Sequence, residues 1–79
     1  MTVMELAKHF SDECMVNIKL AKGEDVDEND LVLCHDWLGY FSRIYDNAEV
    51  VDWFYAKYEG ECDELVVWIK DGYMEEVQI

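Results

Sequence analysis

Residues 65–77 read Leu-Val-Val-Trp-Ile-Lys-Asp-Gly-Tyr-Met-Glu-Glu-Val, and they contain the clearest strand signal in the chain. The run Leu65–Lys70 is apolar and rich in β-branched residues, which favours a buried strand. Asp71 and Gly72 form a two-residue connection that can adopt positive φ. The sequence therefore predicts a hairpin between Leu65–Lys70 and Tyr73–Val77.

Three more strands are predicted N-terminal to this hairpin. From Cys14 to Leu20 apolar and polar residues alternate with a period of two, which is typical of a half-buried strand. The segments Leu31–His35 and Glu49–Tyr58 are rich in residues that favour strands. We therefore expect a sheet of four to five strands.

Helical signals occur in two places. Thr2 and Glu5 have the spacing of a capping box, and apolar residues recur at helical spacing behind them, so a helix is expected from about Val3 to Ser11. A short helix or helical turn is predicted within residues 36–47, although Gly39 and the aromatic residues there would also suit a strand.

The chain contains no proline and no linker-like segment, so residues 1–79 are expected to form a single domain. The element order predicts an α+β fold. It should consist of a mainly antiparallel sheet with the N-terminal helix packed on one face, and a possible second short helix.

The charge balance is strongly negative. The 79 residues include 19 Asp and Glu against 6 Lys and Arg, a net charge of −13, yet 52% of the residues are hydrophobic, far more than a disordered acidic tail would carry. Such a charge repels phosphate, so we expect no direct binding to nucleic acid or to an anionic membrane, and attraction to basic protein surfaces instead.

The sequence also bears on location. No apolar run approaches the length of a membrane span, the N-terminus lacks the features of a signal peptide, and the three cysteines are an odd number. Reduced thiols in a cytoplasmic protein are the expected interpretation.

The acidic residues cluster in two runs. Carboxylates two residues apart on a strand lie about 7 Å apart, similar to neighbouring phosphates, so a rigid array could mimic a nucleic acid. The residues predicted to contact a partner are Glu24, Asp25, Asp27, Glu28, Asp30, Glu59, Glu61, Asp63 and Glu64, with Trp53 and Tyr58 as apolar anchors.

No motif predicts catalysis, a metal site or a cofactor. Asp25, Asp27 and Asn29 have calcium-loop spacing, but Asp30 occupies the position that requires glycine. Cys34 and His35 are adjacent, so on a strand they would point to opposite faces and could not readily share a zinc ion. We therefore expect a protein without enzymatic activity.

In length, acidity, reduced cysteines and α+β pattern, the sequence resembles the short inhibitors that bacteriophages and mobile elements make against host defences, such as anti-CRISPR proteins and other DNA mimics. The resemblance covers the whole chain in size and composition and involves no motif. It implies an inhibitor that occupies the nucleic-acid site of a basic protein, such as a CRISPR effector.

An alternative is a phage or prophage accessory domain that binds a partner, or a second copy of itself, through an aromatic sheet face. Trp53 and Tyr55 should share one face of their strand, and Phe54 and Tyr58 the other. The sequence does not determine which face is core, nor the oligomeric state.

Overall fold

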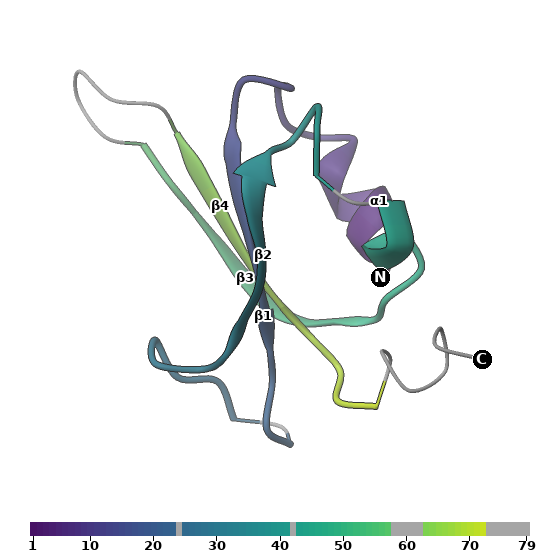
Figure 1. Cartoon of the computed structure of the whole chain (residues 1–79), viewed down its shortest axis with the longest axis vertical. Helices are drawn as coiled ribbons and strands as arrows, with labels where there is room; N and C mark the ends of the chain where they lie inside the picture. The colour runs from purple at the N-terminus through teal and green to yellow at the C-terminus, as the bar shows by residue number, and fades with distance from the viewer. Residues whose placement is uncertain (24, 42, 58–62, 73–79) are drawn as a thin grey trace.

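The computed structural model describes residues 1–23, 25–41, 43–57 and 63–72. These residues form one sheet with a short helix and a 3-10 turn on one side of it (Figure 1). The elements in chain order are α1 (Val3–Ala7), β1 (Met15–Leu20), β2 (Val32–Trp37), the 3-10 turn η1 (Arg43–Tyr45), β3 (Val50–Ala56) and β4 (Glu64–Ile69).

The sheet is mixed. Its strand order is β2-β1-β4-β3, with the central pair β1 and β4 parallel and the two outer pairings antiparallel. Leu65–Ile69 is buried throughout because β4 is a central strand with both faces covered. The four strands and the α+β class confirm the coarse prediction, whereas the parallel centre was not predicted. The second strand of the expected hairpin, Tyr73–Val77, lies outside the described residues.

The helix is shorter than predicted. The capping box is confirmed, because Thr2 Oγ1 accepts from the Glu5 backbone and Glu5 Oε1 accepts from the Thr2 backbone. However, α1 ends at Ala7 rather than near Ser11, because the next N–H groups, of His9 and Phe10, bond carbonyls three residues back instead of four.

The prediction of a short helix or helical turn within residues 36–47 is confirmed in part, because the 3-10 turn η1 lies in this stretch. Trp37 ends strand β2, so the first residues of this stretch are extended rather than helical. A Cβ on Gly39 would lie 3.2 Å from Asp12 Cβ, so the chain turns here against the segment that precedes β1. The spacing of the aromatic residues would suit a helix. The pairing of Trp37 with Met15 and the close approach of Gly39 to Asp12 instead favour a strand that ends at Trp37 and is followed by a turn.

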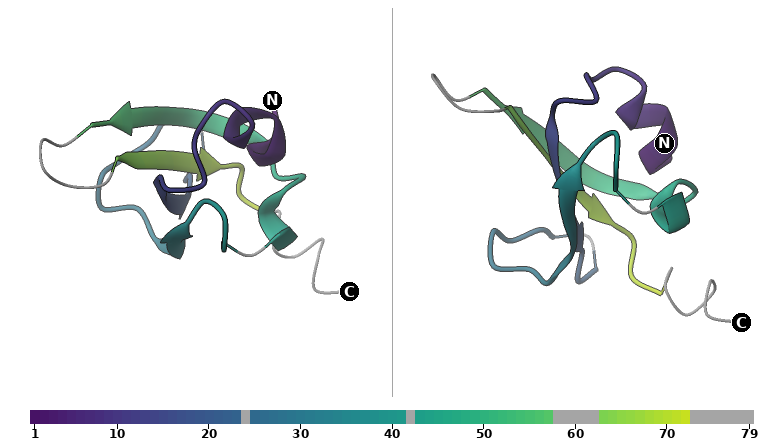
Figure 2. Two further views of the ribbon diagram at one scale, coloured as in Figure 1. Left: turned by 90° about the horizontal axis from the view of Figure 1, so that it is seen from above. Right: turned by 45° about the horizontal axis from the view of Figure 1, so that its top comes forward.

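The main core lies between the sheet and the elements on its helical side. Figure 2 shows α1 and η1 on the same side of the sheet. They pack against alternate residues of the central strands β1 and β4. The buried residues of this core are Val3, Leu6, Cys14, Val16, Ile18, Leu38, Phe41, Tyr45, Ala48, Leu65, Val67 and Ile69. Tyr45 adds a polar tie, because its hydroxyl donates to the Leu33 carbonyl at 3.3 Å and its burial raises its pKa.

The opposite face of the sheet carries a second, smaller cluster. It contains Ala21, Val66 and Trp68, with Val26 and Val51 packed against it. Val26 comes from the loop between β1 and β2, so this acidic loop folds back onto the sheet (Figure 1).

Candidate functional site

The acidic loop between β1 and β2 uses two of its carboxylates to hold its own backbone. Asp30 is only 9% exposed, and its Oδ2 accepts from the Asp27 backbone N–H at 2.8 Å. Asp27 Oδ1 accepts from the Asn29 backbone N–H at 2.9 Å. These bonds form local turns, so Asp30 points its charge into the loop rather than toward a partner.

The same loop is anchored to the sheet below it. Trp68 Nε1 donates to the Asp27 carbonyl at 3.3 Å, and Lys19 Nζ donates to the Glu28 carbonyl at 2.7 Å. Lys19 Nζ also lies 5.5 Å from the centre of the Trp68 ring. The loop is thus a fixed feature in which Asp25 and Glu28 are exposed.

The second acidic run is described only at its end. Asp63 and Glu64 are half-buried where β4 begins, whereas Tyr58, Glu59 and Glu61, like Glu24 of the first run, lie outside the described residues. Because β1 and β4 are parallel, Asp63 lies at the end of the sheet opposite the loop that carries Asp25. Six residues of strand span about 20 Å, so Asp63 and Glu64 do not form one local patch with Asp25 and Glu28.

The side chain of Asp63 is held in place by Tyr55 of strand β3. The Tyr55 hydroxyl donates to Asp63 Oδ2, and this hydrogen bond raises the pKa of Tyr55 to about 12. The Asp63 carbonyl accepts from the Met15 backbone N–H at 2.8 Å, which ties it to the start of β1. Asp63 is therefore a carboxylate whose position is fixed from two sides.

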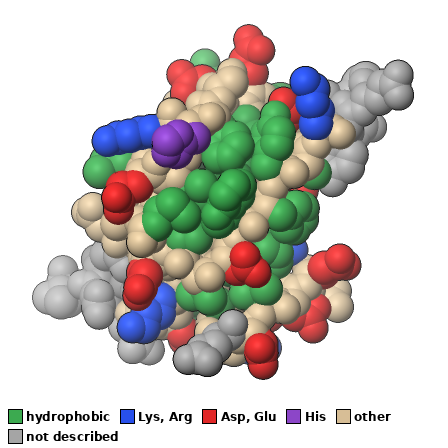
Figure 3. Space-filling view, turned by 180° about the vertical axis from the view of Figure 1, so that it is seen from behind, with side chains coloured by type: hydrophobic (Ala, Val, Ile, Leu, Met, Phe, Trp, Pro, Cys, Tyr) green, Lys and Arg blue, Asp and Glu red, His purple; other side chains and the backbone are tan. Residues whose placement is uncertain are grey.

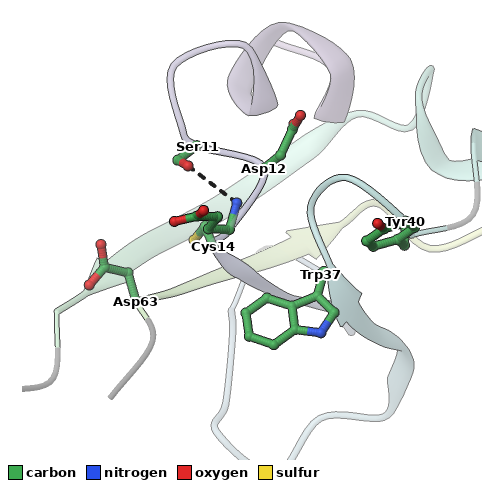
Figure 4. A pocket seen from close by; sticks show the side chains of 7 residues that line it. Ser11, Asp12, Cys14, Trp37, Tyr40 and Asp63 are labelled. Atoms are coloured by element: carbon green, nitrogen blue, oxygen red, sulfur yellow. Dashed lines mark hydrogen bonds between the residues drawn. The ribbon is translucent and has the colours of Figure 1, made fainter. Parts of the chain in front are cut away.

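An open cleft of about 680 Å³ lies at this end of the sheet. Its lining consists of Ser11, Asp12, Glu13, Cys14, Trp37, Tyr40 and Asp63. Figure 4 shows Trp37 and Asp63 on either side of Cys14, with Tyr40 on the turn beyond Trp37. The cleft thus combines three carboxylates with two exposed aromatic side chains, and no described lysine or arginine lines it.

The walls of the cleft are fixed by backbone hydrogen bonds. The N–H of Leu38 donates to the Cys14 carbonyl at 2.8 Å, and that of Gly39 to the Asp12 carbonyl at 3.3 Å. Ser11 Oγ accepts from the Glu13 backbone at 3.2 Å, the bond drawn in Figure 4. The segment before β1 and the turn after β2 are therefore held together.

Sequence reasoning did not select Asp12, Glu13, Trp37 or Tyr40 as binding residues. Asp12 and Glu13 lie outside the two acidic runs of the sequence, and Trp37 and Tyr40 lie in the stretch 36–47, where a helix and a strand were both compatible with the sequence. The signal that could have found them is that Asp12-Glu13 directly precedes a predicted strand, where a loop side chain can meet the end of a neighbouring strand.

A separate aromatic surface lies on the helical side of β3. The Phe10 ring centre is 5.9 Å from that of Trp53 and 5.0 Å from that of Tyr55, and Trp53 and Tyr55 are each 40% exposed. Phe54 points to the other face and meets Trp68 at 5.8 Å. Trp53 and Tyr55 thus share a face as predicted, and each face of β3 is partly exposed. Figure 3 shows hydrophobic side chains gathered in a central area with acidic side chains around it.

Both outer strands contain an Asp-Trp pair with the same local geometry. Asp36 Oδ1 accepts from the Trp37 N–H in β2, and Asp52 Oδ1 accepts from the Trp53 N–H in β3, each at 2.8 Å. Each aspartate side chain therefore accepts a hydrogen bond from a backbone N–H of an outer strand, so that this N–H is not free to bond to another strand. Each aspartate also adds a negative charge beside that strand. Both effects discourage pairing with another strand.

The predicted separation of Cys34 and His35 is confirmed. Cys34 packs against the main core, while His35 is exposed. Within the described ranges, no group of three or more His, Cys, Asp or Glu could hold a metal ion.

The negative charge is little compensated by ion pairs. The described residues make two of them, Arg43 with Asp46 at 2.9 Å and Lys70 with Glu49 at 3.7 Å.

Among the described residues, no helix is long and apolar enough to cross a membrane. Comparison of the chain with protein-family models, with curated proteins and with solved structures found no match.

Proposed function

We propose that this protein is a non-enzymatic acidic inhibitor that binds a basic nucleic-acid-binding protein and blocks its DNA or RNA site by charge mimicry. The observation that carries the proposal is the uncompensated charge. Against a net charge of −13, the two ion pairs of the described residues neutralise few carboxylates. A surface of this kind attracts a cationic groove and gains from releasing its counterions.

Rigidity supports the proposal. Asp25 and Glu28 project from a loop that is anchored on Trp68 and Lys19, and Asp63 is fixed by Tyr55. Charges on fixed backbone lose little conformational entropy when a partner binds. A CRISPR effector belongs to the class of partner that the proposal requires.

The test first captures a binding partner and then asks whether this protein displaces an oligonucleotide from that partner. The immobilised protein is incubated with a bacterial lysate at low salt, and proteins that elute as the salt rises are identified, purified and assayed for binding of a labelled oligonucleotide. The proposal expects a partner that loses its oligonucleotide when this protein is added, with an affinity that falls steeply as salt increases. A partner that keeps its oligonucleotide bound would contradict it.

Charge reversal at each end of the sheet maps the contact. The double variants Asp25→Lys/Glu28→Lys and Asp12→Lys/Glu13→Lys change the net charge equally, so they control for each other. At least one pair should lower the affinity for the partner by tenfold or more. If neither pair changes the affinity, charge mimicry by these residues is wrong.

The aromatic surface of Phe10, Trp53 and Tyr55 favours a second candidate, a domain that binds its partner through apolar contact. Exposed aromatic residues in mutual contact are typical of interface anchors. In that case Trp53→Ala would lower the affinity for the captured partner, and raising the salt would change it little.

A further inference from the structure

We propose that the cleft between Trp37 and Asp63 binds the guanidinium group of an arginine side chain presented by the basic partner. The inference rests on the proposed function and names the point at which the partner docks. It is carried by the lining of the cleft, which contains aromatic rings and carboxylates and, among the described residues, no positive charge.

The two aromatic side chains have the exposure that a cation requires. Trp37 is 39% exposed and Tyr40 is 80% exposed. Elsewhere in the described structure the protein's own cations lie over rings, Lys19 over Trp68 and Arg43 over Phe41 at 5.7 Å. No such pair is found for Trp37 or Tyr40 in the described part of the chain, so their ring faces are available to a cation from outside.

The carboxylates supply the hydrogen-bond acceptors. Asp63 accepts from the Tyr55 hydroxyl through Oδ2, and among the described residues its other oxygen, Oδ1, has no hydrogen-bond donor, so it can accept from a partner. Glu13 is exposed, and its hydrogen bond to Ser11 is made by the backbone N–H rather than by the carboxylate. The side chain of Asp12 points away from the Trp37 indole in Figure 4, so it contributes negative potential rather than a contact.

This combination selects arginine over lysine. A guanidinium is flat, so it can stack on an indole while its several N–H groups reach carboxylates at its edge. An ammonium is a compact and strongly hydrated charge that gains less from stacking. Because the backbone bonds of Leu38 and Gly39 already hold the walls in place, the cleft needs little rearrangement to accept the side chain.

The test is a nuclear magnetic resonance titration of the intact protein with three blocked tripeptides, acetyl-Gly-X-Gly-amide, in which X is arginine, lysine or citrulline. The indole N–H signals of the tryptophans report where each peptide binds. We expect a saturable shift of the Trp37 signal with the arginine peptide, a severalfold weaker affinity with lysine, and no saturable shift with citrulline, which is flat but uncharged.

Trp53 provides a matched control for Trp37. It has nearly the same exposure, lies in the other outer strand and also follows an aspartate that accepts its N–H. Trp37→Leu should abolish saturable arginine binding, whereas Trp53→Leu should retain it. Glu13→Gln should weaken arginine binding severalfold, whereas Glu28→Gln, which removes the same charge from the far end of the sheet, should not.

Three results would overturn the assignment: equal shifts of Trp37 and Trp53, citrulline binding as well as arginine, or equal effects of Glu13→Gln and Glu28→Gln. If Trp37→Leu fails to fold, the proposal is still tested by the relative affinities of the arginine, lysine and citrulline peptides and by the comparison of Glu13→Gln with Glu28→Gln. Failure of the titration while the partner still releases its oligonucleotide would refute the cleft alone. Success of the titration without such competition would refute the proposed inhibition alone.

Discussion

Replacing Asp30 by alanine tests whether the acidic loop is held by its own carboxylates. Asp30 Oδ2 accepts from the Asp27 backbone N–H at 2.8 Å, and the Asp27 carbonyl accepts in turn from Trp68 Nε1. Asp30→Ala removes the first bond and leaves a partly buried N–H without its acceptor. It therefore also weakens the link between the loop and the sheet.

The size of the effect follows from the kind of bond. A hydrogen bond to a charged group contributes about 1.5–3 kcal/mol to the free energy of unfolding. For a domain of this size, at about 4–8 °C per kcal/mol, that loss lowers the melting temperature by roughly 6–24 °C. Asp30→Asn keeps an acceptor oxygen but loses the charge, so its effect should lie between alanine and the original protein.

The measurement is urea denaturation monitored by tryptophan fluorescence, with Asp25→Ala as control. Asp25 is exposed in the same loop, so its replacement relieves charge repulsion equally without removing a bond to the Asp27 N–H. The difference between the two variants therefore isolates the buried hydrogen bond. If Asp30→Ala and Asp25→Ala unfold at the same urea concentration, the loop is not anchored as described.

Three further predictions concern other contacts. Thr2→Ala removes the N-cap of α1 and should lower the free energy of unfolding by about 1 kcal/mol in urea denaturation; an unchanged midpoint would contradict the capping box. Because the pKa of Tyr55 is raised to about 12, its hydrogen bond to Asp63 contributes stability that is complete below pH 10 and is lost as the pH rises through 12. Absorbance titration should show late ionisation of Tyr55 whose pKa returns toward 10 in Asp63→Asn, whereas the pKa of Tyr45, which is raised by burial, should be unaffected by that substitution. Asp52→Ala leaves the outward N–H of Trp53 without its acceptor, so sedimentation should reveal concentration-dependent association through β3, and a strictly monomeric variant would argue against edge protection.

The strands could be predicted because their signal is local. Val16 and Ile18 are buried, while Asn17 and Lys19, which alternate with them, are only half-buried, so alternation in the sequence corresponds directly to the two faces of β1. The capping box at Thr2 is local for the same reason. Each of these patterns is complete within a few residues.

The arrangement of the strands was not predictable in the same way. The parallel pairing of β1 with β4 depends on which strands share a buried face, and alternation within a strand carries no information about its neighbours. Trp37 illustrates a second limit, because its spacing to Phe41 suits a helix equally well. The cleft was missed because Glu13, Trp37 and Asp63 meet only when strand ends from distant segments are brought together.

The parallel centre of the sheet also bears on how the chain folds during synthesis. β1 emerges early from the ribosome, but its inner neighbour β4 is made after every other described strand. Until then Val16 and Ile18 lack the apolar surface of Leu65 and Val67, so the nascent chain cannot complete its core in stages. We therefore expect concerted folding after β4 has left the exit tunnel, at the slow rates typical of pairings between distant segments. Mutual repulsion between unfinished acidic chains would limit their aggregation during that interval.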